Sequence, residues 1–234
     1  MNITVKRASF KLHKISLESS DVERLHDILI TPEHQYNPAA NQPGFRDLCI
    51  EVLPEHPTVL AGEMVEIVSV EVPALNAEGQ QVTYKHNTMV TARFILAPWF
   101  LAVQGKPAAI STVRSIIETK TRQQLLPFRI SPQHLENMSD HMSFIKGLAM
   151  SRLTDSSVKS VKLSGKIETM SDIAPFDQQT EHLSEVKGVL SIGGNIRTVK
   201  VSCDGTISMT LKSGEDLNTD DLILLYKWLD RGRP

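Results

Sequence analysis

The sequence predicts an α+β protein with mixed or antiparallel sheets, packed helices, and a C-terminal β-meander followed by a terminal helix. Several segments alternate apolar and polar residues and are rich in β-branched residues, which favours strands. Other segments space their apolar residues by three and four, as amphipathic helices do. Near the C-terminus, Asp204-Gly205 lies between two alternating segments and predicts a hairpin.

The N-terminal part begins with a predicted strand and a predicted helix. Residues 3–15 combine β-branched residues with lysines, which predicts an edge strand or the arm of a hairpin. We expect the helix to begin at Ser19 or Ser20, because serine caps helix N-termini, and to end at Thr31-Pro32. Its apolar stripe consists of Val22, Leu25, Ile28 and Leu29.

A proline-rich loop and a series of short strands come next. Residues 32–44 hold three prolines and no apolar periodicity, which predicts a surface loop. β-Branched and apolar residues then predict strands at 48–53, 58–60, 64–72 and 81–84. The N-terminal part is therefore expected to be mostly β.

The central part is predicted to mix strands with two helices. Residues 89–96 and 100–103 predict a hairpin or a bent strand around Pro98-Trp99. A helix is expected at 108–126 and a short strand at 128–130. Ser131-Pro132 is typical of a helix start, and an apolar stripe carries this second helix to about residue 149.

The C-terminal part is predicted to be a lysine-bearing strand, a meander and a helix. Residues 158–167 alternate, so that one face meets the core and the other presents lysines. A short helix is expected around 178–185 and a terminal helix at 219–229. Between them lie three predicted meander strands, at 188–192, 196–203 and 206–212.

Charge is distributed unevenly along the chain. The formal net charge is −2, but residues 1–84 carry 6 Lys and Arg against 12 Asp and Glu. Residues 85–212 carry 16 against 10, and residues 213–234 carry 3 against 5. We therefore predict an acidic, β-rich N-terminal part at 1–84 and a basic α+β part at 85–234 that ends in an acidic helix. Such asymmetry indicates a polyanionic partner, or a basic surface shielded by an acidic one.

The sequence also indicates the compartment. No apolar run approaches the roughly 20 residues that cross a bilayer, and the N-terminus lacks the apolar segment of a secretion signal. Cys49 and Cys203 lie far apart and form no C-x-x-C, so we expect buried, reduced thiols. The prediction is a cytoplasmic protein with no membrane partner.

Catalytic signatures are sparse. Phosphate-loop, dinucleotide-binding and hydrolase-elbow motifs are absent from the sequence. Two E-x-K strings, at Glu118 and Glu185, match a fragment of metal-dependent nuclease sites, although such short strings occur by chance. His134 and His141 are seven residues apart and do not converge on a metal. We expect no catalytic residues, metal or cofactor.

Basic residues provide the main functional hint. From Arg93 to Lys166 there are 11 Lys and Arg but only 4 Asp and Glu. Cations placed along phosphates release counterions and bind a duplex without reading its sequence. The predicted phosphate contacts lie on one helix and one strand; they are Arg114, Lys120, Arg122, Lys159, Lys162 and Lys166.

The segment "TARFILAPWFLAVQGKPAAISTVRSIIETKTRQQLLPFRIS", with the strand "SSVKSVKLSG" after it, resembles the RexA family of phage-exclusion DNA-binding proteins. The meander "KGVLSIGGNIRTVKVSCDGTISMTL" is more faintly similar to the recombination-associated RdgC family. The resemblance spans residues 91–166 and extends towards 212, whereas the acidic N-terminal part matches neither family. It implies a homodimer that binds double-stranded DNA with little sequence preference and without enzymatic activity, in phage defence or exclusion.

The leading prediction is a non-enzymatic nucleic-acid-binding protein, acting on duplex DNA with little sequence preference. Two alternatives remain. One is an interaction or assembly subunit that uses its acidic half against itself, as a homo-oligomer, or against a protein partner. The other is a metal-dependent nuclease.

Overall fold

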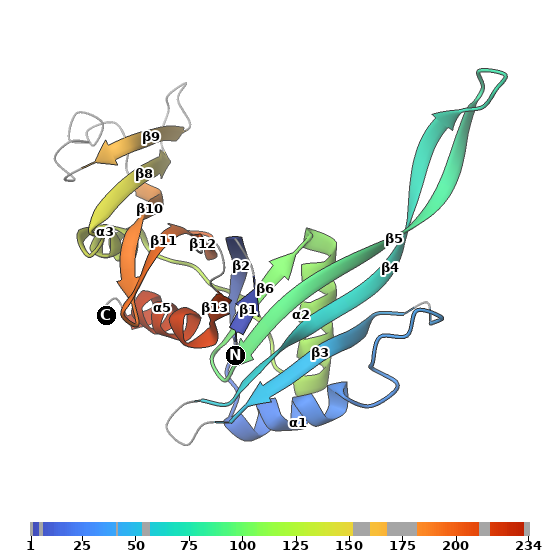
Figure 1. Cartoon of the computed structure of the whole chain (residues 1–234), viewed down its shortest axis with the longest axis horizontal. Helices are drawn as coiled ribbons and strands as arrows, with labels where there is room; N and C mark the ends of the chain where they lie inside the picture. Colours follow the sequence, from blue (N-terminus) through green and yellow to red (C-terminus); the bar gives the residue numbers. More distant parts are fainter. Residues whose placement is uncertain are drawn as a thin grey trace. The chain divides into compact units, whose positions relative to one another are not determined.

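The chain folds into two compact units (Figure 1). The computed structural model describes residues 2–4, 7–40, 42–52, 57–151, 160–167, 182–210 and 216–231. We call Lys14–Leu126 the hairpin unit, and Met1–His13 with Pro127–Pro234 the meander unit. Both units combine antiparallel strands with helices packed against them, so the α+β class is confirmed.

The hairpin unit is a set of four antiparallel strands with two helices. The strands lie in the order β3 (Gly44–Glu51), β4 (Val59–Leu75), β5 (Gln81–Ala97) and β6 (Phe100–Gly105). Helices α1 (Ser19–Leu29) and α2 (Pro107–Thr121) bury their apolar stripes against these strands. The resulting core includes Val22, Leu25, Met64, Phe94, Val113 and Ile117.

The long hairpin replaces four shorter predicted strands. β4 and β5 pair residue by residue from Leu60 opposite Leu96 to Leu75 opposite Gln81. The segments predicted at 58–60 and 64–72 are thus one strand, as are those at 81–84 and 89–96. In β5 the prediction was wrong because residues 85–88 are polar and mostly exposed, so no apolar alternation marks them as strand. In β4 it was wrong because residues 61–63, Ala-Gly-Glu, have low strand propensity although they are mostly buried.

The helix boundaries of this unit also differ in detail from the prediction. The N-cap of α1 is Glu18, which forms a reciprocal capping box with Asp21, so neither Ser19 nor Ser20 is the cap. α2 ends at Thr121, several residues before the predicted end, because Arg122 takes the left-handed conformation with φ 57°.

The meander unit contains six strands in the order β2, β12, β11, β10, β8 and β9. Every adjacent pair is antiparallel. Their bounds are Arg7–Lys14, Thr206–Thr210, Asn195–Ser202, His182–Ile192, Phe144–Ser151 and Ser160–Ile167. Two short strands, β1 (Asn2–Thr4) and β13 (Asp216–Asn218), pair separately, and β7 (Leu126–Pro127) links the two units along the chain.

Two helices, α3 (Pro132–Asp140) and α5 (Thr219–Arg231), belong to the meander unit. The buried pair Arg197 and Asp221 joins β11 to α5, with Nη2 and Oδ2 3.3 Å apart. The Phe128 and Tyr226 rings lie 5.1 Å apart, and His141 meets Trp228 edge-on. These contacts place α5 on the face of the strands that Arg197 shares with Val199 and Val201.

The meander and the terminal helix are confirmed, but three predictions in this unit were wrong. The helix predicted from 132 to 149 ends at Asp140, and the rest forms strand β8. Residues 128–130 form separate backbone hydrogen bonds to Leu12 and Cys203 and are not a strand. Residues 182–185 of the predicted helix at 178–185 belong to β10, and its earlier residues lie outside the described part of the chain.

The domain boundary predicted at 84/85 would fall inside β5, where Tyr84 pairs with Val72. The structure instead groups residues 14–126 together. The prediction that both cysteines are buried was wrong: Cys49 is exposed and Cys203 is partly exposed. None of the described helices is long and apolar enough to cross a membrane.

Candidate nucleic-acid interface

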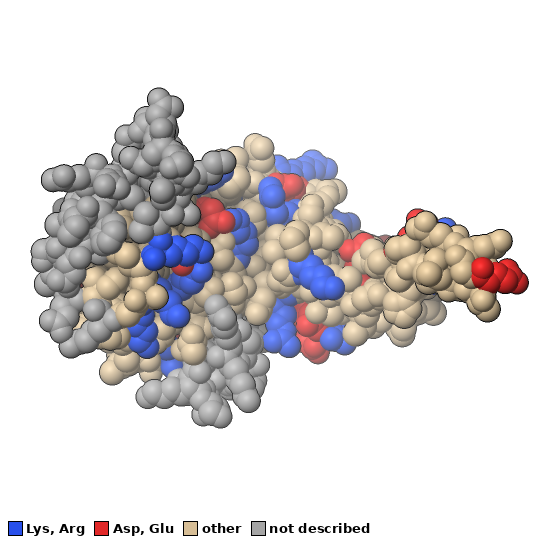
Figure 2. Space-filling model, turned by 90° about the horizontal axis from the view of Figure 1, so that it is seen from above, with Lys and Arg blue, Asp and Glu red and all other residues tan. Residues whose placement is uncertain are grey.

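Five lysines share the open face of the meander strands. In β11 the buried residues Arg197, Val199 and Val201 alternate with the less buried Thr198, Lys200 and Ser202. Because α5 covers the Arg197 side, Lys200 projects from the opposite side. We call this side the lysine face; its cations are Lys11, Lys146, Lys162, Lys187 and Lys200. The left part of Figure 2 shows Lys and Arg side chains side by side with little red among them.

Strand register brings these residues together. Lys200 lies opposite Lys187 in β10 and opposite Ser208 in β12. Lys187 in turn lies opposite Gly147, and Gly147 lies opposite Ser164 in β9. Since neighbouring strands are about 4.8 Å apart, the two lysines are separated by about one strand spacing. Like charges directly opposite one another destabilise a sheet, and here the Glu185 carboxylate, 2.7 Å from Lys200 Nζ, offsets part of the repulsion.

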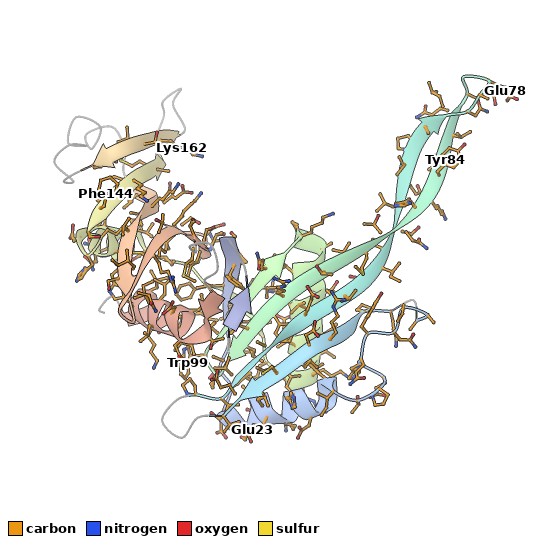
Figure 3. All side chains as sticks on the ribbon, viewed as in Figure 1. Glu23, Glu78, Tyr84, Trp99, Phe144 and Lys162 are labelled. Carbon is orange, nitrogen blue, oxygen red and sulfur yellow. The ribbon has the colours of Figure 1, made fainter. Side chains whose placement is uncertain are left out.

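The remaining lysines are placed on this face by contacts or by register. Lys146 Nζ donates to the Thr198 hydroxyl at 3.1 Å, reaching across β10 to β11. Lys11 Nζ donates to the Asp204 carboxylate at 2.6 Å. Lys162 lies opposite Ala149, which itself lies opposite Glu185, and its exposed side chain is labelled in Figure 3.

Two carboxylates partly neutralise the lysine face. Glu185 pairs with Lys200 at 2.7 Å, and Asp204 pairs with Lys11. Burial tends to raise the pKa of Asp204, but hydrogen bonds from Lys11, Ser202 and Thr206 outweigh it and hold that pKa well below its usual value. Five lysines and two ionised carboxylates leave a charge of about +3 among these groups.

Hydroxyl groups fill the spaces between the lysines. The hydroxyls of Ser9 and Ser208 are hydrogen-bonded at 2.8 Å, and Thr198 lies opposite Thr210 in the next strand. Serine and threonine hydroxyls are common partners of phosphate oxygens. The lysine face thus offers cations and neutral donors, which suits a phosphate backbone.

The three phosphate contacts predicted on a helix belong to the hairpin unit, where Arg114 has other partners. Arg114 is half-buried, donates to the Leu125 carbonyl at 3.1 Å and pairs with Glu118 at 3.6 Å. Lys120 lines a polar hollow that also contains Glu33. Arg122 is exposed at the left-handed end of α2. Among these three, Arg122 is the most accessible to a phosphate.

The predicted strand contacts belong to the meander unit. Lys162 lies on the lysine face, Lys166 lies in β9 with a side chain outside the described set, and Lys159 lies outside the described residues. The structure therefore divides the six predicted residues between two units. It also adds four lysines that sequence reasoning missed: Lys11, Lys146, Lys187 and Lys200.

A signal for two of these lysines was present in the sequence. Lys187 and Lys200 sit at the polar positions of alternating strands whose apolar residues, Val186, Val199 and Val201, are buried. That alternation predicts which side of the sheet they occupy. Lys187 and Lys200 lie opposite one another because of the register of the neighbouring strands β10 and β11, which the Gly193-Gly194 turn fixes.

The two E-x-K strings have structural partners. Glu118 accepts the Leu125 backbone N–H at 2.8 Å as well as pairing with Arg114, which holds the chain after α2. Glu185 pairs with Lys200. Among the described residues, no group of three or more His, Cys, Asp or Glu side chains is placed to hold a metal ion.

Two hollows lie elsewhere, one in each unit. An apolar hollow of ≈ 310 Å³ in the meander unit lies beside α5; its lining includes His141, Leu190, Ile192, Leu224 and Trp228. A polar hollow of ≈ 670 Å³ in the hairpin unit lies between the loop before β3 and α2; its lining includes Glu33, His34, Ser111, Ser115 and Lys120. Neither combines several cations as the lysine face does.

No protein-family model matches the chain, and no curated protein is similar to it.

Proposed function

We propose that this protein binds nucleic acid, with duplex DNA as the main target, through the lysine face and without catalysing a reaction. The observation that carries the proposal is that five lysines project from one side of adjacent antiparallel strands, with serine and threonine hydroxyls between them. A duplex presents closely spaced phosphates, and each lysine beside a phosphate releases a condensed counterion.

The composition of the face favours binding with little sequence preference. Lysine acts as a compact point charge on a flexible stem, unlike the planar arginine that pairs with guanine edges. The only described arginine in the central meander strands, Arg197, is buried against Asp221 and does not reach the face. Contacts to phosphates fix a protein on DNA but carry no direct sequence information.

Fluorescence anisotropy tests this proposal with two unrelated duplexes of about 20 base pairs, a single strand and a duplex RNA at low salt. We expect dissociation constants in the micromolar range or tighter, similar for the two duplexes. The double variant Lys162→Gln/Lys187→Gln removes two exposed cations of the lysine face. It should weaken duplex binding about tenfold or more, at roughly 1 kcal/mol per phosphate contact.

The matched control is Lys85→Gln/Lys106→Gln, which removes two exposed cations from the hairpin unit. It should leave the affinity within about twofold, apart from the general loss of positive charge. Absence of binding to any of these nucleic acids, or equal weakening by the two double variants, would overturn the proposal. If the single strand or the duplex RNA binds more tightly than duplex DNA, the preferred target changes, but the lysine face remains the proposed binding surface.

A further inference from the structure

The outer part of the β4–β5 hairpin, residues 67–90, forms an arm that extends beyond α1 and α2 of its own unit (Figure 1). Its strands stay paired from Ile67 opposite Met89 to Leu75 opposite Gln81. At the tip, the Asn76 side-chain oxygen accepts the backbone N–H groups of Glu78 and Gln80. The arm is therefore a regular two-stranded ribbon closed by an ordered turn.

The two faces of the arm differ in chemistry. Side chains in a strand alternate between faces, and directly opposed residues share a face. One face, which we call the valine face, carries Val68, Val70, Val72, Ala74, Val82, Tyr84, His86 and Thr88. The other face is mixed: it carries the arm's paired charges, Glu71 opposite Lys85, and polar residues such as Ser69 and Thr83, with the exposed apolar Met89 and Leu75 at its two ends. Figure 3 labels Tyr84 on the arm and Glu78 at its tip.

The valine face continues the face that α2 covers. Glu66, two residues before Val68, accepts the Thr112 hydroxyl of α2 at 3.1 Å, and Val90, opposite Glu66, packs against the buried core. Beyond this point the cover ends: Val70 is 44% exposed, Val72 45% and Tyr84 57%. Two-stranded ribbons are marginally stable in water unless one face is covered. The arm therefore needs a covering surface.

The absence of charged side chains on the valine face indicates what kind of surface covers it. None of the eight residues on the valine face is Lys, Arg, Asp or Glu, so this face offers no lysine or arginine to a phosphate backbone and none of these four side chains as an ion-pair partner to a charged protein surface. A two-fold contact places each face against a copy of itself, where any fixed charge would meet its own kind. An uncharged, β-branched face meets that requirement.

The area of the valine face is also consistent with a second copy of the chain as its partner. Four residue pairs on this face cover a length of roughly 27 Å and a width of about 10 Å. Two such faces present roughly 540 Å² of flat area, and the relief of their side chains raises the accessible area that they can bury to at most about 1,000 Å², the lower limit for a specific interface. We propose that two copies of this chain associate through their valine faces, arm against arm about a two-fold axis.

Light scattering and sedimentation velocity test the contact with the full chain, without nucleic acid and with a reductant for the exposed Cys49. From about 1 to 100 μM, the wild-type chain should shift from monomer to dimer, because an interface at the lower limit of size is expected to be weak. Val70→Glu/Val72→Glu should remain monomeric, because each introduced carboxylate would face its own copy. Ser69→Glu/Thr83→Glu adds the same charges to the opposite face of the arm and should dimerise like the wild type.

A second variant covers the case in which the glutamates disrupt the arm itself. Replacing residues 69–87 by Asn-Gly closes the hairpin between Val68 and Thr88, which are opposite one another, with a favoured two-residue turn. This variant should stay monomeric, with the circular dichroism of a folded α+β protein that has lost only the strand signal of the deleted residues. A monomeric wild type at 100 μM, or a dimer that persists in both variants, would overturn the inference, whichever way nucleic-acid binding turns out.

Discussion

At the scale of single residues, a lysine's partners decide what it can bind. Lys11 and Lys200 are paired with carboxylates on the same face, whereas Lys162 and Lys187 are exposed. An exposed lysine exchanges water and counterions for a phosphate at little cost, while a paired lysine must first give up its carboxylate. Lys162 and Lys187 are therefore the residues whose removal should weaken binding most.

Asp204 gives a prediction about pH. Its folded-state pKa lies below the unfolded value of about 4, so folding favours the ionised carboxylate. The stabilisation is present above about pH 4 and is lost as the pH falls below it. Because the Asp204 side chain is 49% exposed, solvent screens the effect and we expect less than about 1 kcal/mol.

Urea unfolding near neutral pH and at about pH 3 measures this contribution. Asp204→Asn should lose less stability on acidification than the wild type, since its amide does not titrate. An equal or larger loss in the variant would mean that the contacts of Asp204 do not favour its ionised form.

Sequence alone could not separate the arginines by role. Arg197 follows the buried alternation of Val199 and Val201, so its side chain is predictably inward. Nothing in the sequence indicates that Asp221, on a helix 24 residues later, would meet it there. Arg114 was predicted to contact phosphate, yet it is held by Glu118 in α2 and by the Leu125 carbonyl in the loop that follows.

At the scale of elements, irregular strands explain the clearest wrong prediction. Ile145 and Leu148 are three residues apart and both buried, which imitates a helical stripe. In β8 the register shifts between Ile145 and Gly147, so the alternation changes phase and both side chains face the core. A bulge depends on the neighbouring strands, so the periodicity of one segment does not reveal it.

Turns, in contrast, were predictable from local chemistry. Asp204-Gly205 and Gly193-Gly194 close the two hairpins of the meander, and both Gly205 and Gly194 have φ 80°. Positive φ favours glycine, because it lacks a Cβ atom. The meander was therefore predicted from its turns as much as from its strands.

Two glycine substitutions separate backbone conformation from packing. Gly79→Ala, at φ 76° in the arm's turn, adds a methyl group with nothing near it, so we expect a cost of about 1 kcal/mol. Gly205→Ala adds the same strain and a clash with the Phe128 carbonyl oxygen, so its cost should exceed about 2 kcal/mol. Denaturant unfolding of both variants measures the difference, and equal costs would contradict the close approach of Phe128.

At the scale of the whole molecule, folding redistributes the charge seen along the sequence. The hairpin unit carries 9 Lys and Arg against 13 Asp and Glu, and the meander unit carries 16 against 14. The sequence blocks of −6 and +6 thus become units of −4 and +2. Five lysines of the meander unit gather on the lysine face. Composition alone could not reveal this clustering, because it depends on strand register.

The division into units also gives a prediction. Every residue of the core formed by α1, α2 and their strands lies between Ile15 and Leu125. A fragment of residues 14–126 should therefore fold alone and unfold cooperatively on heating. A fragment of residues 1–84 should not, since it lacks most of β5, the partner of β4. Circular dichroism of both fragments checks this, and a folded 1–84 fragment would contradict it.

The dependence of duplex binding on salt tests the lysine face most directly. Each phosphate contact contributes about 0.9 to the slope of log affinity against log salt. We predict that Lys162→Gln/Lys187→Gln lowers the slope by about 2 relative to the wild type, and that Lys85→Gln/Lys106→Gln leaves it nearly unchanged. An unchanged slope in the first variant, or an equal decrease in both, would contradict the account.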